Sequence, residues 1–273
     1  MKLFISFFLI TMLVFSSCSK KDSAENQTAV GQQTSSKEIS YMVDTTTMKG
    51  YIAYPKNQEV KSPAILVVHE WWGHNAYARK RADMLAELGY VALAVDMYGE
   101  GKQADHPKDA QKFAMSVMGN FEMAKARFAK ALETLKADPR VDPDKIGAIG
   151  YCFGGSVVLS MVNSGFDLDA AAVFHAGLQL PVQPEKGRIQ TKVLVCNGGA
   201  DPMVTEENIA DFKESMENAG VDYNFITYEG AQHAFTNPGA TELGKKFGLP
   251  LAYDQKADKG SWEEMTKLFA SVF

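Results

Sequence analysis

The feature that most constrains this chain is a cysteine in a glycine-rich turn between an apolar run and a helix-like run. Segment 145–156 reads KIGAIGYCFGGS, so that Gly150 and Gly154 flank Cys152 at a spacing of two. The apolar run 146–149 predicts a strand and the run 157–162 predicts a helix. Glycine neighbours permit the strained backbone of such a tight turn. A cysteine at the start of a helix is also favoured in its nucleophilic thiolate form.

The Gly-x-Cys-x-Gly pattern matches the nucleophile elbow, Gly-x-Ser-x-Gly, of α/β-hydrolases, with a thiol in place of the hydroxyl. The five residues alone leave a second reading open, in which Cys152 is a small buried side chain in a strand–helix packing turn. Evidence from other residues of the chain is therefore needed to distinguish a nucleophilic Cys152 from a structural one.

Composition indicates one large globular domain. The chain has 273 residues, of which 46% are hydrophobic and 22% are charged, values typical of a globular fold. The formal net charge is -5. Because this leaves no excess of basic residues, nucleic acid is not expected as a partner.

The N-terminus reads as a targeting segment. Residues 1–17 combine a charged start, an apolar core and two serines, and Cys18 follows. This is typical of a signal peptide and is too short for a comfortable transmembrane helix. The small-small-Cys ending resembles a bacterial lipoprotein signal, in which Cys18 becomes the lipidated first residue; a plain signal peptide with an incidental Cys18 is the alternative. Residues 18–37 are polar and predict a flexible tether, and 38–273 form the domain.

We therefore expect an exported bacterial lipoprotein, anchored to a membrane through its N-terminal lipid and located in the periplasm or at the cell surface. Beyond Cys18, only Cys152 and Cys196 remain. Two cysteines do not make a disulfide framework, and both are expected as free thiols.

Strands and helices alternate along the rest of the chain. Continuous apolar runs such as 64–69, 91–95 and 170–174 predict strands that are buried on both faces. Further strands are predicted at 38–43, 50–54, 192–196 and 223–228, and helices at 75–88, 107–118, 121–135, 206–219 and 261–272. This order predicts an α/β fold, a mostly parallel sheet with helices on both faces.

Ligands bind at the carboxyl ends of the strands in such sheets. Polar residues that follow strands are therefore candidates for a site: Glu70, Asp96, Cys152, His175, Asp201 and His233.

Three of these candidates have the chain order of an α/β-hydrolase triad, which is nucleophile, acid and histidine. Asp201 follows a buried strand in a Gly-Gly turn, and His233 lies in the loop after the last predicted strand. A thiol nucleophile needs a neighbouring base, and the acid holds that base in the correct tautomer. Singly, each residue is explained as a turn aspartate or a surface histidine; together they predict the catalytic set Cys152, Asp201 and His233.

The other histidines fit catalysis or metal binding less well. His175 ends a strand but precedes Asp201, which would break the chain order, so it is expected to line the pocket or to make a polar contact. His69 and His74 flank Glu70 at a spacing of five across a strand end, whereas the helical zinc motif requires a spacing of four. No metal and no cofactor are expected.

Taken together, the motifs resemble the dienelactone hydrolase family of α/β-hydrolases over about residues 38–272. The resemblance is carried by His69-Glu-Trp-Trp-Gly73, the elbow 150–155, Asp201 and Gly230-x-x-His233-x-Phe235. It implies that Glu70 contacts the resting thiol and that the amides of Trp71 and Phe153 form the oxyanion hole. Paired amides aimed at a developing oxyanion are also a large contribution to acyl transfer in general.

The sequence departs from the family where the substrate would bind. In the namesake enzyme, arginines hold the substrate carboxylate from the loop after the fourth strand and from four residues beyond the catalytic histidine. Here those positions correspond to Glu100 and Asn237. An acidic dienelactone is therefore not the expected substrate.

We expect a hydrolase that cleaves a small activated ester, lactone or thioester through an acyl-thioester on Cys152. A plain alkyl ester fits less well, because the tetrahedral intermediate can expel the thiolate again. Two alternatives remain: a non-catalytic ligand-binding domain on the same scaffold, and a redox role for the thiol of Cys152.

Overall fold

The computed structural model describes Met1 and residues 34–56 and 58–273. The predicted signal peptide 1–17, the predicted lipidation site Cys18 and most of the predicted tether 18–37 lie outside the described residues. In the described part of the chain, no helix is both long enough and apolar enough to cross a membrane.

One eight-stranded sheet forms the centre of the fold, in the order β1-β2-β4-β3-β5-β6-β7-β8. The strands are β1 (Ser35–Val43), β2 (Thr46–Tyr54), β3 (Ser62–Val68), β4 (Val91–Val95), β5 (Val141–Tyr151), β6 (Ala170–Phe174), β7 (Lys192–Gly198) and β8 (Tyr223–Tyr228). β1 and β2 pair antiparallel with each other and β2 pairs antiparallel with β4, whereas the remaining pairs from β4 to β8 are parallel. The carboxyl ends of β3 to β8 therefore meet at one edge.

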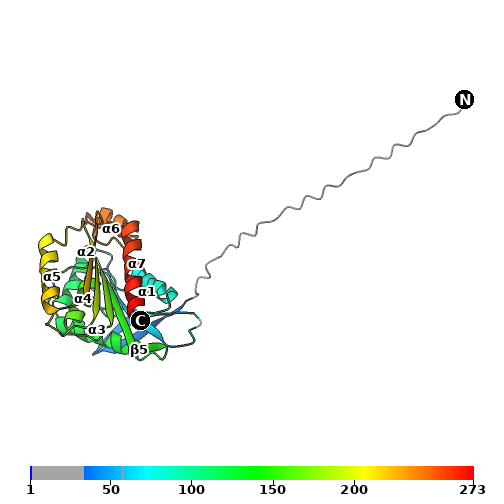
Figure 1. Ribbon diagram of the computed structural model, residues 1–273, viewed down its shortest axis with the longest axis horizontal. Helices are drawn as coiled ribbons and strands as arrows, with labels where there is room; N and C mark the ends of the chain where they lie inside the picture. Colours follow the sequence, from blue (N-terminus) through cyan, green and yellow to red (C-terminus); the bar gives the residue numbers. More distant parts are fainter. Residues whose placement is uncertain (2–33, 57) are drawn as a thin grey trace. The chain divides into compact units, whose positions relative to one another are not determined.

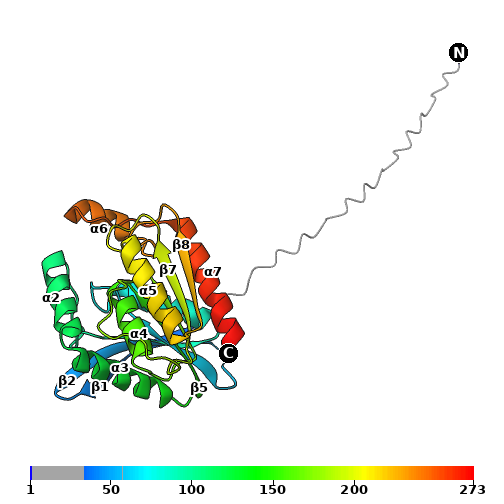
Figure 2. The same cartoon turned by 60° about the vertical axis from the view of Figure 1, so that its left-hand side comes forward.

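Helices cover both faces of the sheet (Figures 1 and 2). They are α1 (Ala76–Glu87), α2 (Pro107–Met118), α3 (Phe121–Lys136), α4 (Phe153–Asn163), α5 (Glu206–Ala219), α6 (Ala240–Phe247) and α7 (Gln255–Val272). One apolar core contains Phe128, Val157 and Phe212 from α3, α4 and α5, and the other contains Leu85 and Phe269 from α1 and α7. The predicted α/β architecture is confirmed.

A third, smaller apolar cluster lies beside the site. It joins Trp72 in the loop after β3, Ala110 of α2, Ala240 of α6 and Leu251. α2 and α6 lie at the end of the molecule where the strands finish, apart from the helices that cover the two faces (Figure 2). Val117 of α2 also belongs to the first apolar core, whereas the buried residues of α6 contribute only to this small cluster within the described part of the chain.

Several element boundaries differ from the prediction. The first strand begins at Ser35, so the last residues assigned to the tether, up to Lys37, belong to the sheet. β5 begins at Val141 and not at Ile146; Pro143 lies in this extension, where the pairing with β3 shifts register. α7 begins at Gln255, because the Asp254 side chain accepts a hydrogen bond from the Ala257 amide.

Candidate active site

Cys152 lies at the turn between β5 and α4, in a strained backbone conformation. Its φ of 53° and ψ of -117° are uncommon for a residue with a side chain. The flanking glycines allow this turn, because a Cβ atom at Gly150 would meet the Gly154 carbonyl and one at Gly154 would meet the Val68 carbonyl. The sharp turn carries Cys152 to the edge where the parallel strands end, and leaves it partly exposed.

His233 and Asp201 form a buried pair in the loops that follow β8 and β7. The His233 Nδ1 atom lies 2.7 Å from the Asp201 Oδ2 atom. The other carboxylate oxygen, Oδ1, accepts a hydrogen bond of 2.9 Å from the Met203 amide. Both oxygens of Asp201 are therefore occupied, which fixes the carboxylate beside the imidazole.

The imidazole of His233 faces Cys152. Burial opposes protonation of this histidine, but the charge of Cys152 and the hydrogen bond to Asp201 outweigh burial and raise its pKa to about 10. Among the described residues, the His233 Nε2 atom has no partner that meets full hydrogen-bond geometry, although a weaker hydrogen bond to the Cys152 sulfur also contributes to the raised pKa. The two side chains line one cavity, and Nε2 is the nitrogen free to exchange a proton.

This cavity, the catalytic cavity, has a volume of about 240 Å³. Its lining comprises Trp71, Ala114, Cys152, Phe153, Ser156, Gly177, Met203, Val204, His233 and Leu251. Apart from Cys152, His233 and Ser156, these residues present apolar groups or backbone. An ester carbonyl with apolar surroundings fits such a cavity, because few polar groups would have to lose water.

His69 fixes the peptide group between Glu70 and Trp71. Its Nε2 atom lies 3.2 Å from the Met97 amide, which can only donate, so the ring proton is on Nδ1. Nδ1 then donates to the Glu70 carbonyl oxygen over 2.6 Å, and burial lowers the pKa of His69 and keeps the ring neutral. The Gly73 amide donates to the same oxygen over 3.1 Å.

Trp71 and Phe153, whose amides are the expected oxyanion hole, both line the catalytic cavity. Because a trans peptide directs its N–H group opposite to its carbonyl, the bonds to the Glu70 oxygen orient the Trp71 N–H group. The Phe153 amide is the first of α4, where N–H groups have no partner in the helix. Sequence reasoning placed His69 in the motif 69–73 and rejected a metal role for it, but did not predict that its side chain orients this peptide group; its position directly before Glu70 was the available signal.

The carboxyl of Glu70 is held by an amide side chain. The Asn237 Nδ2 atom donates to the Glu70 Oε2 atom over 2.6 Å. Burial raises the pKa of Glu70 to about 7, although the bond from Asn237 and the charges of His233 and Arg81 act in the opposite direction. Among the described residues no hydrogen bond joins Glu70 to Cys152, so the expected contact with the thiol stays a prediction.

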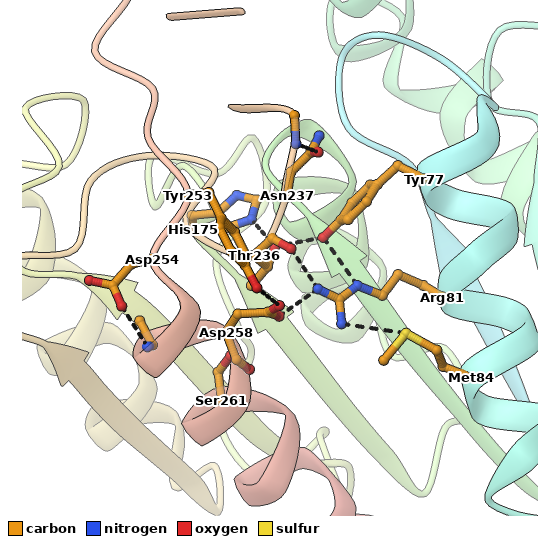
Figure 3. Close-up of polar contacts among 12 residues, drawn as sticks. Tyr77, Arg81, Met84, His175, Thr236, Asn237, Tyr253, Asp254, Asp258 and Ser261 are labelled. Carbon is orange, nitrogen blue, oxygen red and sulfur yellow. Dashed lines mark hydrogen bonds and ion pairs between the residues drawn. The ribbon is translucent and has the colours of Figure 1, made fainter. Parts of the chain in front are cut away.

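A buried arginine, Arg81, stabilises the loop that carries His233 through a bond to the backbone of that loop (Figure 3). The Arg81 Nη2 atom donates to the Thr236 carbonyl over 2.6 Å and to the Asp258 carboxylate over 2.5 Å. The Thr236 hydroxyl lies 2.6 Å from the Tyr77 hydroxyl and 2.7 Å from the His175 Nε2 atom. His175 thus makes the polar contact expected of it, and its ring packs against that of His233 with 5.2 Å between centroids.

The second cysteine of the domain is remote from this chemistry. Cys196 is buried in β7, and burial raises the pKa of its thiol to about 12. β6 lies between β7 and β5, the strand that leads to Cys152. Both thiols are free. Among the described residues, no group of three histidine, cysteine or acidic side chains could hold a metal ion.

The strand order, the strained cysteine turn and the buried acid–histidine pair define an α/β-hydrolase fold. The chain belongs to the dienelactone hydrolase family, whose model matches residues 48–273. It is therefore a dienelactone hydrolase-like hydrolase.

Relatives and solved structures agree with this assignment. Protein usf of Aquifex pyrophilus is 31% identical over 194 residues, which cover 70% of this chain and 82% of that protein. The "Putative carboxymethylenebutenolidase" of Aquifex aeolicus is 29% identical over 227 residues, covering 81% and 92%. The crystal structure of a dienelactone hydrolase-like promiscuous phosphotriesterase from metagenomic libraries superposes with a TM-score of 0.80 at 33% identity, covering 88% of this chain and 99% of that one.

Proposed function

We propose that this protein hydrolyses a small activated ester, lactone or thioester with Cys152 as nucleophile, His233 as acid and base, and Asp201 as the group that orients His233. The observation that carries the proposal is the strained turn at Cys152, which opens onto the same cavity as the imidazole of the 2.7 Å His233–Asp201 pair. Strain of this kind gathers at functional sites, because surrounding structure has to maintain it.

The first half of the reaction forms an acyl-enzyme. His233 takes the thiol proton, and the Cys152 sulfur attacks the carbonyl carbon, whose electron pair moves onto oxygen. The amides of Trp71 and Phe153 donate to this oxyanion. The intermediate then collapses, the bond to the alcohol oxygen breaks, and His233 gives its proton to that oxygen.

The second half regenerates the thiol. His233 removes a proton from water, the resulting hydroxide attacks the thioester carbon, and the carbon–sulfur bond breaks. The acid product leaves and the proton returns to Cys152. The Asp201 carboxylate accepts a hydrogen bond from His233 Nδ1 throughout and stabilises the imidazolium that forms in each half.

The residues in place of the family's arginines indicate the substrate. The Asn237 side chain is bonded to Glu70, and Glu100 accepts a hydrogen bond from the Thr47 amide over 2.9 Å. Neither group supplies a positive charge for a substrate carboxylate. We therefore infer an uncharged ester or lactone, in contrast to the acid that the relatives' name carboxymethylenebutenolidase denotes.

Cys152→Ala tests the reaction with p-nitrophenyl acetate, using a chain that lacks residues 1–33 and so keeps all of β1. Loss of the nucleophile is expected to lower kcat/KM by about a thousandfold or more, whereas Cys196→Ala is expected to retain activity. Equal rates for the parent chain and Cys152→Ala would contradict the proposal and favour the non-catalytic binding domain. Loss of activity in Cys196→Ala with retained folding would favour a thiol redox role.

The N-terminal segment supports a second part of the proposal, that the protein is an exported lipoprotein anchored to a membrane through Cys18, in the periplasm or at the cell surface. The support is the sequence alone, Ser16-Ser17-Cys18 after an apolar core. Metabolic labelling with an alkyne fatty acid is expected to label the protein, and Cys18→Ser is expected to abolish the label. Labelling that persists in Cys18→Ser would contradict the anchor.

A further inference from the structure

A second cavity, here named the side groove, adjoins the catalytic cavity. It has a volume of about 500 Å³ and lies between α5, the end of α4 and segment 178–183. The same parts of the chain line both cavities. Ala114 of α2 lines the catalytic cavity, and Met118, one turn further along the helix, lines the side groove. Likewise, Gly177 lines the catalytic cavity and the next residue, Leu178, lines the side groove.

The entry to α5 repeats this arrangement. Val204, just before the helix, lines the catalytic cavity, and Asn208 in its first turn lines the side groove. Ala114 and Met118 are four apart within α2, and residues at this spacing on a helix are neighbours, with about 5–6 Å between their Cβ atoms. Because three separate parts of the chain contribute neighbouring residues to the two linings, the side groove lies beside the catalytic cavity.

Size indicates that a substrate uses both spaces. Sites for small molecules usually have volumes of about 300–1,000 Å³. The catalytic cavity, at about 240 Å³, is below that range, whereas the side groove adds about 500 Å³. A substrate whose carbonyl is beside Cys152 therefore has room for a second group as large as, or larger than, the part at the sulfur.

The lining of the side groove is rich in amides. Asn163, at the end of α4, is buried; its Nδ2 atom donates to the Val182 carbonyl over 2.8 Å, and its Oδ1 atom has no hydrogen-bond partner among the described residues. The Ser215 hydroxyl donates to the Gln183 Oε1 atom over 2.7 Å, which leaves the amide hydrogens of Gln183 free for a ligand. Gln179 and Asn208 add further amide groups.

Charge narrows the class of ligand. Asp211 is the only charged residue in the lining of the side groove, within the described part of the chain. A carboxylate or phosphate would meet this negative charge with no cation to compensate it. Asp211 is exposed, so its attraction for a cation is weak. A wholly apolar group would remove water from several amides without replacing their hydrogen bonds.

We propose that the side groove binds a neutral polyhydroxyl group, such as a glycosyl unit, of an ester whose carbonyl is attacked at Cys152. Hydroxyl groups both donate and accept, so they can donate to Asp211 and accept from the side-chain amides. This inference rests on the proposed function, and names its substrate class as esters that carry a sugar or other polyol.

Three esters with one acyl group and one phenol ring test the inference on the purified full-length protein. They are 4-methoxyphenyl acetate, 4-acetoxyphenyl β-glucoside and 4-acetoxyphenyl β-glucuronide, which differ only in a methyl, a neutral sugar or a sugar carboxylate beyond the ring. The glucoside is expected to show a kcat/KM about tenfold or more above that of the methyl ether, equivalent to about 1.4 kcal/mol. The glucuronide is expected to lose most of this gain.

Two pairs of variants link the gain to the side groove. Met118→Trp fills it, and is expected to bring the glucoside-to-methyl-ether ratio close to one, whereas Met115→Trp, on an exposed position of the same helix, is expected to keep the parent ratio. Asp211→Asn is expected to restore part of the glucuronide rate. Glu214 is an exposed carboxylate of α5 that does not line the groove, so Glu214→Gln is expected to leave the glucuronide rate unchanged.

The outcomes separate the two proposals. If none of the esters is hydrolysed, the proposed function fails. If all three are hydrolysed with equal kcat/KM, or if Met118→Trp and Met115→Trp give the same ratio, the ester hydrolysis stands and the side groove is not a sugar site. A higher rate for the glucuronide than for the glucoside would also overturn the inference.

Discussion

The buried carboxyl of Glu70 makes the stability of this protein depend on pH. Burial raises its pKa from an ordinary 4.5 to about 7 in the folded state. Between these two values the folded protein holds a proton that the unfolded chain has released. The free energy of unfolding therefore falls as the pH rises from 4.5 to 7. Above pH 7 the contribution of Glu70 to this free energy no longer changes with pH.

The magnitude follows from the same two values. One pKa unit corresponds to about 1.4 kcal/mol, so ionisation of Glu70 lowers stability by about 3 kcal/mol at pH 9 relative to pH 4.5. Little of this is screened, because Glu70 is 2% exposed. A glutamine has the shape of the protonated acid and can accept the hydrogen bond from Asn237, so Glu70→Gln removes the ionisation with little change in packing.

Urea unfolding of parent and Glu70→Gln at pH 4.5, 6, 7.5 and 9 measures this effect. The two proteins are expected to have similar stability at pH 4.5, and the variant is expected to be about 3 kcal/mol more stable at pH 9. Glu87→Gln, at an exposed carboxylate of α1, is the control and is expected to track the parent. A difference between parent and Glu70→Gln that is the same at every pH would refute the reasoning.

Three further predictions concern other parts of the site. His69→Phe removes the donor that orients the Trp71 amide, and is expected to lower kcat for p-nitrophenyl acetate by about 10- to 100-fold with KM nearly unchanged; a rise in KM alone would contradict this role. Arg81→Met strands the Asp258 carboxylate and is expected to cost about 3–5 kcal/mol in urea unfolding, whereas Arg79→Met, at an exposed pair with Glu38, is expected to cost under about 1 kcal/mol. Iodoacetamide followed by peptide mass spectrometry is expected to modify Cys152 and to spare the buried Cys196; equal labelling of both would be inconsistent with the burial of Cys196 in β7.

The fold could be predicted largely because its strands are apolar runs with clear stops. β4, β6, β8 and α5 have the predicted limits, since each is bounded by glycine, proline or polar residues. α6 was missed because its N-cap, Gly239, provides no side-chain cap and the helix has only eight residues. The start of α4 at Phe153 was hidden by Gly154 and Gly155, which have poor helix propensity but pack too closely for any side chain.

The candidate site was predictable where chemistry and chain order coincide, and not where it depends on distant partners. The pairing of Asp201 with His233 follows from the ends of two strands that are adjacent in the sheet. No local pattern indicates that Asn237 reaches Glu70, 167 residues away, or that Arg81 holds the Thr236 carbonyl. Such contacts depend on which loops lie next to one another at the end of the sheet. From helical periodicity alone, Arg81 cannot be distinguished from the other polar residues of α1.

The amide at position 237 has a consequence for the whole catalytic cavity. A guanidinium at this position, where the family's namesake enzyme carries an arginine, would favour the ionised form of the Glu70 carboxyl through its charge. Asn237 supplies a hydrogen bond without charge, so burial prevails and the Glu70 proton is half-occupied near neutral pH. Because a protonated Glu70 adds no negative charge beside the Cys152–His233 pair, the cavity is closer to neutral than one that holds an ionised carboxylate. The uncharged ester proposed as substrate would bring no further charge into this cavity.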